Sequence, residues 1–141
     1  MTTRTSNAEW KGNLKDGAGT VSLGSGAFSG SYSFPSRFET GDGTNPEELI
    51  AAAHAACYSM ALAHALSTAG FVPNAVKTTA RVRLEQVADG FAITHIVLDC
   101  LASVPNISTN AFQDHAQSAK TGCPVSKALA ATEITLNATL E

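Results

Sequence analysis

The chain has 141 residues and a mass of 14.5 kDa, which is the length of a single domain. Hydrophobic residues make up 44% of it and charged residues 15%, a balance that excludes an intrinsically disordered chain. The net charge is −3, and the nine lysines and arginines form no basic cluster that would bind nucleic acid or an anionic membrane. We therefore expect one domain over residues 1–141, with neither of these partners.

Cysteine usage and the N-terminal segment indicate the compartment. Three cysteines, Cys57, Cys100 and Cys123, cannot all pair within one chain, and their spacing matches no disulfide framework. The first ten residues, MTTRTSNAEW, lack the apolar core of a signal peptide. Both observations favour a cytoplasmic protein whose thiols are reduced at rest.

Short strands joined by tight turns are expected in the first forty residues. Segments 9–11 and 20–23 are predicted strands, and the aromatic residues Phe28, Tyr32 and Phe34 suit a further strand. The Gly-Ser-Gly of residues 24–26 is not followed by a helix, so we interpret it as a loop and not as a phosphate-binding turn.

The longest predicted helix starts after Asn45 and ends near Ala69. Asn45 is a suitable N-cap, Pro46 fits the first helical position, and Glu48 stands where a capping box places its carboxylate. Gly70 supplies a C-terminal stop.

This helix is apolar almost all round, and only His54, Ser59 and His64 interrupt the run from Leu49 to Leu66. The run is long enough to span a membrane, but eight of its eighteen residues are alanine, two are histidine, and no basic flank sets an orientation. A helix that is apolar on every side is buried. Because a chain of 141 residues scarcely surrounds about 35 Å of helix, we expect a second subunit to cover part of it.

Beyond this helix the pattern predicts a β-hairpin, two helices and a final strand. Asp89-Gly90 is the hairpin turn, and Ser108 is the N-cap of the first helix. The expected elements are the strands 76–87 and 91–104, the helices 108–120 and 123–131, and the strand 134–140. The chain is therefore assigned to the α+β class.

The cysteines stand in different settings. Cys57 lies in the middle of the apolar helix, where a buried thiol has a raised pKa and needs a nearby cation to react. Cys123 precedes Pro124 at a helix N-cap, where backbone amides and the helix dipole favour a thiolate. Cys100 lies in a hairpin strand beside Asp99, without a cationic neighbour, and is interpreted as structural.

Two other kinds of site are disfavoured. His54 and His64 flank Cys57 on one helix, but they lie about 15 Å apart along it, too far to share a metal ion. The chain has no Cys-x-x-Cys pair and no His-Glu-x-x-His motif. It also lacks the Gly-x-Ser-x-Gly turn of a serine hydrolase. We expect neither a metal nor a cofactor.

Both cysteine segments resemble the OsmC/Ohr family, the osmotically inducible and organic hydroperoxide resistance proteins. The segment TNPEELIAAAHAAC (44–57) is similar to the family signature, and GCPVSK (122–127) is similar to its second cysteine motif. Arg37 matches the family's arginine. The resemblance spans essentially the whole chain and is closer to the OsmC branch. It implies an OsmC-like α+β fold, with antiparallel sheets packed around long central helices in an intertwined homodimer.

The resemblance also implies a function and its residues. The family is known as thiol peroxidases that act on organic hydroperoxides and hydrogen peroxide, with two sites at the subunit interface. It implies Cys57 as the attacking thiol and Cys123 as the resolving thiol. Arg37 would activate Cys57, and Glu47 would hold Arg37. A dithiol such as a lipoyl group is the implied reductant.

The chemistry of the residues agrees with this resemblance. An unperturbed cysteine is only a few per cent thiolate at pH 7, and lowering its pKa by two units takes about 2.7 kcal/mol, which an adjacent arginine can supply. On a helix, Glu47 projects about 80° from Cys57 and Glu48 about 180°, so Glu47 is the better partner for such an arginine. Glu47 and Cys57 are also about 15 Å apart along the axis, which favours a site completed by a second subunit.

Two alternatives use the same residues. In a non-catalytic stress or ligand-binding protein of this fold, the cysteines are packing groups and Arg37–Glu47 is a structural ion pair. In a redox sensor, a Cys57–Cys123 disulfide signals to a partner.

Four large apolar side chains either line a pocket for an alkyl tail or build the core: Phe38, Met60, Phe71 and Phe112.

Overall fold

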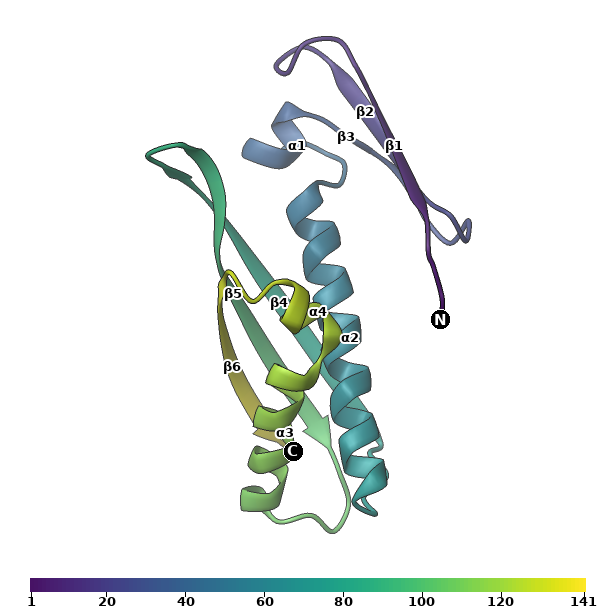
Figure 1. Ribbon diagram of the computed structural model, residues 1–141, viewed down its shortest axis with the longest axis vertical. Coiled ribbons are helices and arrows are strands. Elements are labelled where there is room, and N and C mark those ends of the chain that lie inside the picture. Colours follow the sequence, from purple (N-terminus) through teal and green to yellow (C-terminus); the bar gives the residue numbers. More distant parts are fainter. The chain divides into compact units, whose positions relative to one another are not determined.

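Two three-stranded sheets and four helices make up the protein, which we describe from a computed structural model of residues 1–141 (Figure 1). The elements follow one another in the order β1-β2-β3-α1-α2-β4-β5-α3-α4-β6. The chain divides into two units, residues 1–49 and 50–141, and each unit contains one of the sheets. We describe the two units separately.

The first sheet is an antiparallel meander of β1 (Ser6–Lys11), β2 (Ala18–Leu23) and β3 (Ser29–Tyr32). The strands predicted at 9–11 and 20–23 are confirmed, and both extend further toward the N-terminus. Trp10 and Tyr32 lie with ring centroids 5.4 Å apart. Gly19 lies against both rings, since a Cβ there would be 2.5 Å from Tyr32 and 2.8 Å from Trp10.

The expectation that Phe34 belongs to a strand is wrong, because this residue opens the short helix α1 (Phe34–Phe38). Ser33 is the N-cap, and it exchanges side-chain and backbone hydrogen bonds with Ser36 in a capping box. Pro35 fits the first turn, where a missing amide hydrogen costs nothing. The capping signal is therefore present in the sequence, but the alternating aromatic residues conceal it.

Helix α2 (Pro46–Thr68) begins where predicted and ends within a residue of the expected position. The Asn45 side chain accepts a hydrogen bond from the amide of Glu48 at 2.8 Å, and Gly70 adopts a positive φ of 93° beyond the last turn. Glu48 does not complete the predicted capping box. Its carboxylate instead accepts a hydrogen bond from the Thr44 hydroxyl at 2.9 Å.

The second sheet is mixed, whereas antiparallel sheets were expected. Strands β4 and β5 form the predicted hairpin, and β6 pairs with β5 in parallel. Helices α3 and α4 connect β5 to β6, and such a helical crossover brings the next strand in parallel to the first. The bounds are β4 (Ala75–Val87), β5 (Gly90–Ser103), α3 (Thr109–Gly122), α4 (Pro124–Ala128) and β6 (Glu133–Leu140).

The hydrophobic core lies between this sheet and helices α2 and α3 (Figure 1). Every second residue of β5 from Ile96 to Ala102 points into it, because side chains alternate along a strand. The helices contribute Tyr58, Leu62, Leu66, Phe112, Ala116 and Ala119. Within residues 50–141, only one side of α2 is thus covered.

The opposite side of α2 is an exposed stripe of small and apolar residues. The Met60 side chain is 74% exposed. The α2 stripe consists of Ala52, Ala53, Ala56 and Met60. By length and composition alone, α2 could also cross a membrane, a test that the core helices of soluble proteins pass as well.

Candidate active site

Helices α2 and α4 bring Cys57 and Cys123 into direct contact. Their Sγ atoms are 2.8 Å apart and hydrogen-bonded, and both residues are free thiols. Cys57 is half-buried, whereas Cys123 is fully buried. Because the sulfurs of a disulfide are about 2.05 Å apart, a small approach of the two sulfurs is enough to form the bond.

The two thiols ionise as a coupled pair. Burial raises the pKa of Cys57, and the hydrogen bond with Cys123 raises it further, against a smaller opposing effect of the Val125 backbone. Burial also opposes ionisation of Cys123, but contacts with Cys57 and with the backbone and hydroxyl of Ser126 hold its pKa below the ordinary value. The surroundings within residues 50–141 therefore oppose ionisation of Cys57 and favour ionisation of Cys123.

The position of Cys123 explains this preference. Cys123 is the N-cap of α4, as predicted, and Pro124 occupies the first turn. The thiol makes no close capping hydrogen bond, yet the amides of Val125 and Ser126 at the start of the helix favour its ionised form.

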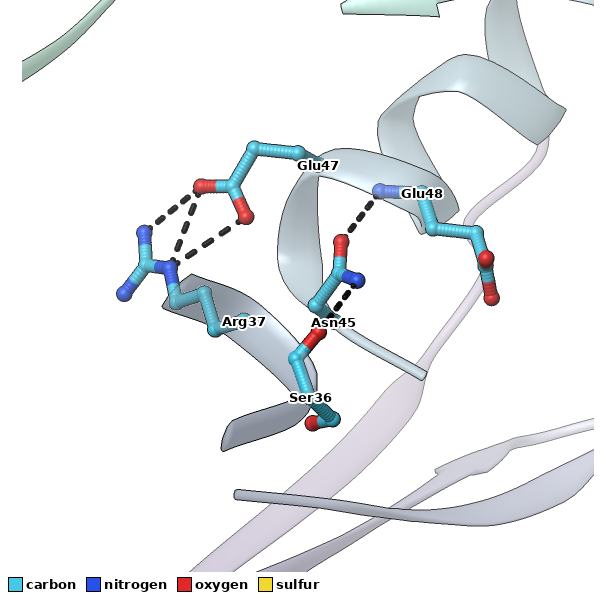
Figure 2. Close-up of polar contacts among 5 residues, drawn as sticks. All are labelled: Ser36, Arg37, Asn45, Glu47 and Glu48. Carbon is cyan, nitrogen blue, oxygen red and sulfur yellow. Dashed lines mark hydrogen bonds and ion pairs between the residues drawn. The ribbon is translucent and has the colours of Figure 1, made fainter. Parts of the chain in front are cut away.

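The predicted ion pair between Arg37 and Glu47 lies in the first unit (Figure 2). The Nε atom of Arg37 is 3.2 Å from both carboxylate oxygens of Glu47, and Nη2 is 2.7 Å from Oε1. Glu47 is buried, and the Arg37 side chain is 35% exposed. Because a guanidinium is planar and always charged, this two-pronged contact sets the orientation of Arg37.

Polar contacts between α1 and the start of α2 hold this pair in place. The Ser36 hydroxyl donates to the carbonyl of Thr44 at 2.7 Å, and the Asn45 side-chain amide donates to the carbonyl of Ser36 at 2.9 Å. Asn45 is also the N-cap of α2 (Figure 2). Since Arg37 follows Ser36 and Glu47 lies two residues after Asn45, the same contacts bring both charged side chains together.

A second hydrogen bond joins α2 to α4 beside the cysteines. The Nε2 atom of His54 lies 2.7 Å from Oγ of Ser126, and both side chains are buried. The sequence motifs assigned no role to either residue. A signal was present, because His54 precedes Cys57 by three residues and Ser126 follows Cys123 by three. Residues at this spacing lie on the same side of a helix.

Cys100 and His64 lie outside the contacts between α2 and α4. Cys100 is buried in the core, where burial raises its pKa against a smaller opposing effect of the Thr78 hydroxyl. This placement agrees with the structural interpretation of Cys100. His64 is exposed on α2. No group of three metal-ligating side chains comes together in the chain.

The large apolar side chains that could line a pocket or build the core do not gather around one cavity. Phe112 is fully buried and Phe71 packs against the same core, while Met60 is exposed. An apolar cavity of about 220 Å³ lies instead in the first unit. It is lined by Ala8, Val21, Tyr32, Asn45, Pro46 and Leu49.

Fold and site together define an α+β dithiol protein, with two sulfurs in contact between helices and a buried carboxylate that holds an arginine. A family model described as OsmC-like protein matches residues 39–138. The chain therefore belongs to the OsmC/Ohr family.

Individual relatives place it on the OsmC branch. The chain is 53% identical to Peroxiredoxin OsmC of Escherichia coli (strain K12) over 131 residues, which cover 92% of this chain and 91% of the relative. It is 36% identical over 89 residues to the organic hydroperoxide resistance protein of Xanthomonas axonopodis pv. citri, covering 62% and 61%. The crystal structure of an organic hydroperoxide resistance protein from Elizabethkingia anophelis superposes with a TM-score of 0.75 at 25% identity, covering 99% of both chains.

Proposed function

We propose that the protein is a thiol peroxidase that reduces organic hydroperoxides and hydrogen peroxide, with Cys57 as the attacking thiol and Cys123 as the resolving thiol. The observation that carries the proposal is the 2.8 Å distance between the two sulfurs. The names of its relatives, peroxiredoxin and organic hydroperoxide resistance protein, support the same reaction.

The reaction proceeds in three steps. The Cys57 thiolate attacks one peroxide oxygen, so an S–O bond forms, the O–O bond breaks, and the leaving oxygen is protonated to an alcohol or water. Cys57 is then a sulfenic acid. The sulfur of Cys123 displaces hydroxide from Cys57, which leaves as water, and a disulfide forms. An external dithiol restores both thiols by exchange.

Arg37 supplies the positive charge that the first step requires. Burial raises the pKa of Cys57, so a cation is needed to populate its thiolate at neutral pH. The contacts with Glu47 use Nε and Nη2 of Arg37. We assign Nη1 to stabilise the thiolate and the leaving oxygen. In this proposal, Glu47 fixes the arginine and does not itself react.

A second copy of the chain completes the enzyme. The α2 stripe is apolar and exposed along a helix whose other side is buried, so water contacts a surface that association would cover. Its alanines permit close approach of another helix. We place the dimer contact on the α2 stripe and two shared active sites beside it.

The reductant and the compartment follow from the chemistry. A catalytic disulfide must be reduced in every cycle, which a dithiol such as a lipoyl group does by exchange. A reducing cytoplasm maintains such a donor. We compare turnover with reduced lipoamide and with glutathione at an equal concentration of thiols. Faster turnover with lipoamide supports this assignment, and faster turnover with glutathione contradicts it.

Peroxide consumption tests the proposal directly. Purified protein is mixed with tert-butyl hydroperoxide and excess dithiothreitol, and the loss of peroxide is followed for the wild type, Cys57→Ser and Cys123→Ser. Cys100→Ser is the matched control, since it removes a thiol outside the pair. The wild type and Cys100→Ser are expected to turn over many times, and Cys57→Ser not at all.

Without reductant, Cys123→Ser is expected to consume one equivalent and to gain the mass of one oxygen. Absence of consumption by fully reduced wild type above the uncatalysed rate would reject the enzyme and favour a binding protein. A single oxidation followed by poor turnover with any dithiol would favour the redox sensor.

A further inference from the structure

Helices α2 and α4 are joined by two neighbouring hydrogen bonds, and only one of them involves the cysteines. The Cys57–Cys123 contact is 2.8 Å long, and the His54–Ser126 contact is 2.7 Å long. In both helices the two contributing residues are three positions apart. The second contact therefore lies one helical turn from the first and braces the same pair of helices.

The surroundings of His54 determine which way its hydrogen bond points. Its side chain is fully buried, and Nδ1 has no hydrogen-bond partner. Burial lowers the pKa of His54, so the ring is neutral at pH 7 and carries one proton. An unpaired buried N–H is rarer in proteins than an unpaired acceptor. We therefore assign the proton to Nε2, which then donates to Oγ of Ser126.

This direction leaves the hydroxyl hydrogen of Ser126 free to donate elsewhere. Ser126 is the third residue of α4, one turn after the N-cap Cys123. A side chain at this position lies near the N-cap residue, and in a capping box it accepts a hydrogen bond from that residue's backbone amide. The Ser126 hydroxyl favours the ionised form of Cys123. We therefore assign the sulfur of Cys123 as the acceptor of its hydrogen.

We propose that His54 and Ser126 form a buried relay, from His54 Nε2–H through the Ser126 hydroxyl to Cys123 Sγ, that positions Cys123 and stabilises its thiolate for attack on oxidised Cys57. The inference rests on the proposed peroxidase function and deepens it. It assigns His54 and Ser126 as positioning residues for the second chemical step and not for the attack on peroxide.

The relay assists the formation of the disulfide. The Cys123 thiolate forms the S–S bond while the S–O bond of the Cys57 sulfenic acid breaks. Hydroxide leaves and becomes water with the proton that Cys123 had released. The Cys123 sulfur is oxidised by one electron, and the Cys57 sulfur is reduced by one.

The titratable groups around the relay come from α2, α3, α4 and β5. Lys120 of α3 and Lys127 of α4 line a cavity together with Ser126. Cys57 and Tyr58 face Cys123 from α2, and Tyr58 also interacts with Cys100 of β5. Burial raises the pKa of both Tyr58 and Cys100 above the ordinary value, so they stay neutral at pH 7. Once Cys57 is a sulfenic acid, the pH profile of disulfide formation reports mainly on Cys123.

The chain offers a matched control for the relay. His95 Nε2 lies 2.7 Å from the Thr135 hydroxyl, a pairing of the same chemical type between β5 and β6. Neither residue contacts a thiol of the pair. Ser126→Ala and Thr135→Val each remove one hydroxyl from a histidine contact and leave the volume almost unchanged.

Single-turnover oxidation tests the proposal. Reduced protein is mixed with one equivalent of cumene hydroperoxide without reductant, quenched at intervals with an alkylating agent, and analysed by mass spectrometry. This separates sulfenic acid formation at Cys57 from disulfide formation. In Ser126→Ala the first step is expected at the wild-type rate. The second is expected to be about tenfold slower at pH 7, the order expected for losing one hydrogen bond to an ionised group, with its pH profile shifted upward.

Variants of His54 distinguish the relay from packing. His54→Gln keeps an N–H donor of similar reach and is expected to retain most of the rate of disulfide formation, whereas His54→Leu is expected to lose it. If His54→Leu does not fold, the rates of disulfide formation in Ser126→Ala and His54→Gln test the relay. Thr135→Val is expected to match the wild type.

Two results would overturn the inference while leaving the peroxidase intact. One is disulfide formation in Ser126→Ala at the wild-type rate across the pH range. The other is a slowing of disulfide formation that is the same at every pH in Ser126→Ala and equally large in Thr135→Val. Failure of the wild type to form any sulfenic acid rejects the proposed function itself, which is a separate outcome.

Discussion

Glu47 binds two nitrogen atoms of Arg37 across the junction between the five-residue helix α1 and the 23-residue helix α2. The pair depends on two short segments whose contacts are made by Ser36, Thr44 and Asn45. A substitution that removes the charge of Glu47 but keeps its shape therefore measures how much this contact contributes to the orientation of Arg37.

Glu47→Gln is expected to lower kcat/KM for cumene hydroperoxide by about tenfold to a hundredfold, because hydrogen bonds to a charged partner contribute on the order of 1.5–3 kcal/mol. The shape of the side chain is preserved, so the loss reflects the poorer orientation of Arg37. Initial rates with excess dithiothreitol measure the effect. The control is Glu48→Gln, whose carboxylate contacts Thr44 and not Arg37. Equal losses in the two variants contradict the assignment.

Arg37→Lys is expected to shift the ionisation of Cys57 to higher pH. A lysine keeps the charge but cannot make the two-pronged contact with Glu47, so it is held less well in place. The measurement is the pH dependence of iodoacetamide alkylation of Cys57, in a background lacking Cys123 and Cys100. Arg83→Lys is the control, since Arg83 makes only an exposed ion pair of 3.9 Å with Glu85. An unchanged alkylation profile in Arg37→Lys removes Arg37 from the activation of Cys57.

The buried His54 makes the stability of the protein pH-dependent. An unfolded histidine has a pKa of about 6.5, and burial lowers that pKa in the folded state. The unfolded chain therefore binds more protons in the interval between the two values, and the free energy of unfolding falls as pH drops below about 6.5. This loss ends once the pH passes below the folded pKa.

Urea unfolding of the wild type and His54→Gln at pH 7.5 and 5.5 checks this expectation. The midpoint of the wild type should fall more between these pH values than that of His54→Gln, which has no group to protonate. His64→Gln removes an exposed histidine and should follow the wild type. A wild type and a His54→Gln variant with the same pH dependence would mean that the pKa of His54 is the same in the folded and unfolded chains, which contradicts the effect of burial.

Met60→Glu is expected to convert the proposed dimer into a monomer, because it places a charge on the α2 stripe, where a second copy would exclude water. Light scattering coupled to size-exclusion chromatography measures the mass. Val72→Glu is the control, since Val72 is exposed to a similar extent, 73% against 74% for Met60, but lies beyond the end of α2. A dimeric Met60→Glu variant, or a monomeric wild type, contradicts the placement of the interface.

Local signals determined most elements from the sequence alone. Asn45 and Gly70 delimit α2, Ser108 caps α3, and the Asp89-Gly90 turn sets the hairpin, because caps and turns act on backbone groups within a few residues. The motifs around Cys57 and Cys123 likewise indicate the family and both thiols, because each motif is one continuous run of residues. The helix α1 was missed, since a five-residue helix has little periodicity to reveal it.

Only the tertiary structure decided how these elements meet. The contact of Cys57 with Cys123 spans 66 residues and that of His54 with Ser126 spans 72, so no local pattern could supply either distance. The parallel pairing of β6 depends on where the α3–α4 crossover returns the chain. Packing of α2 and α3 on the second sheet also decided which side of an evenly apolar helix is buried. Propensities and spacing act along the chain, whereas burial and contact depend on which distant segments come to share one core.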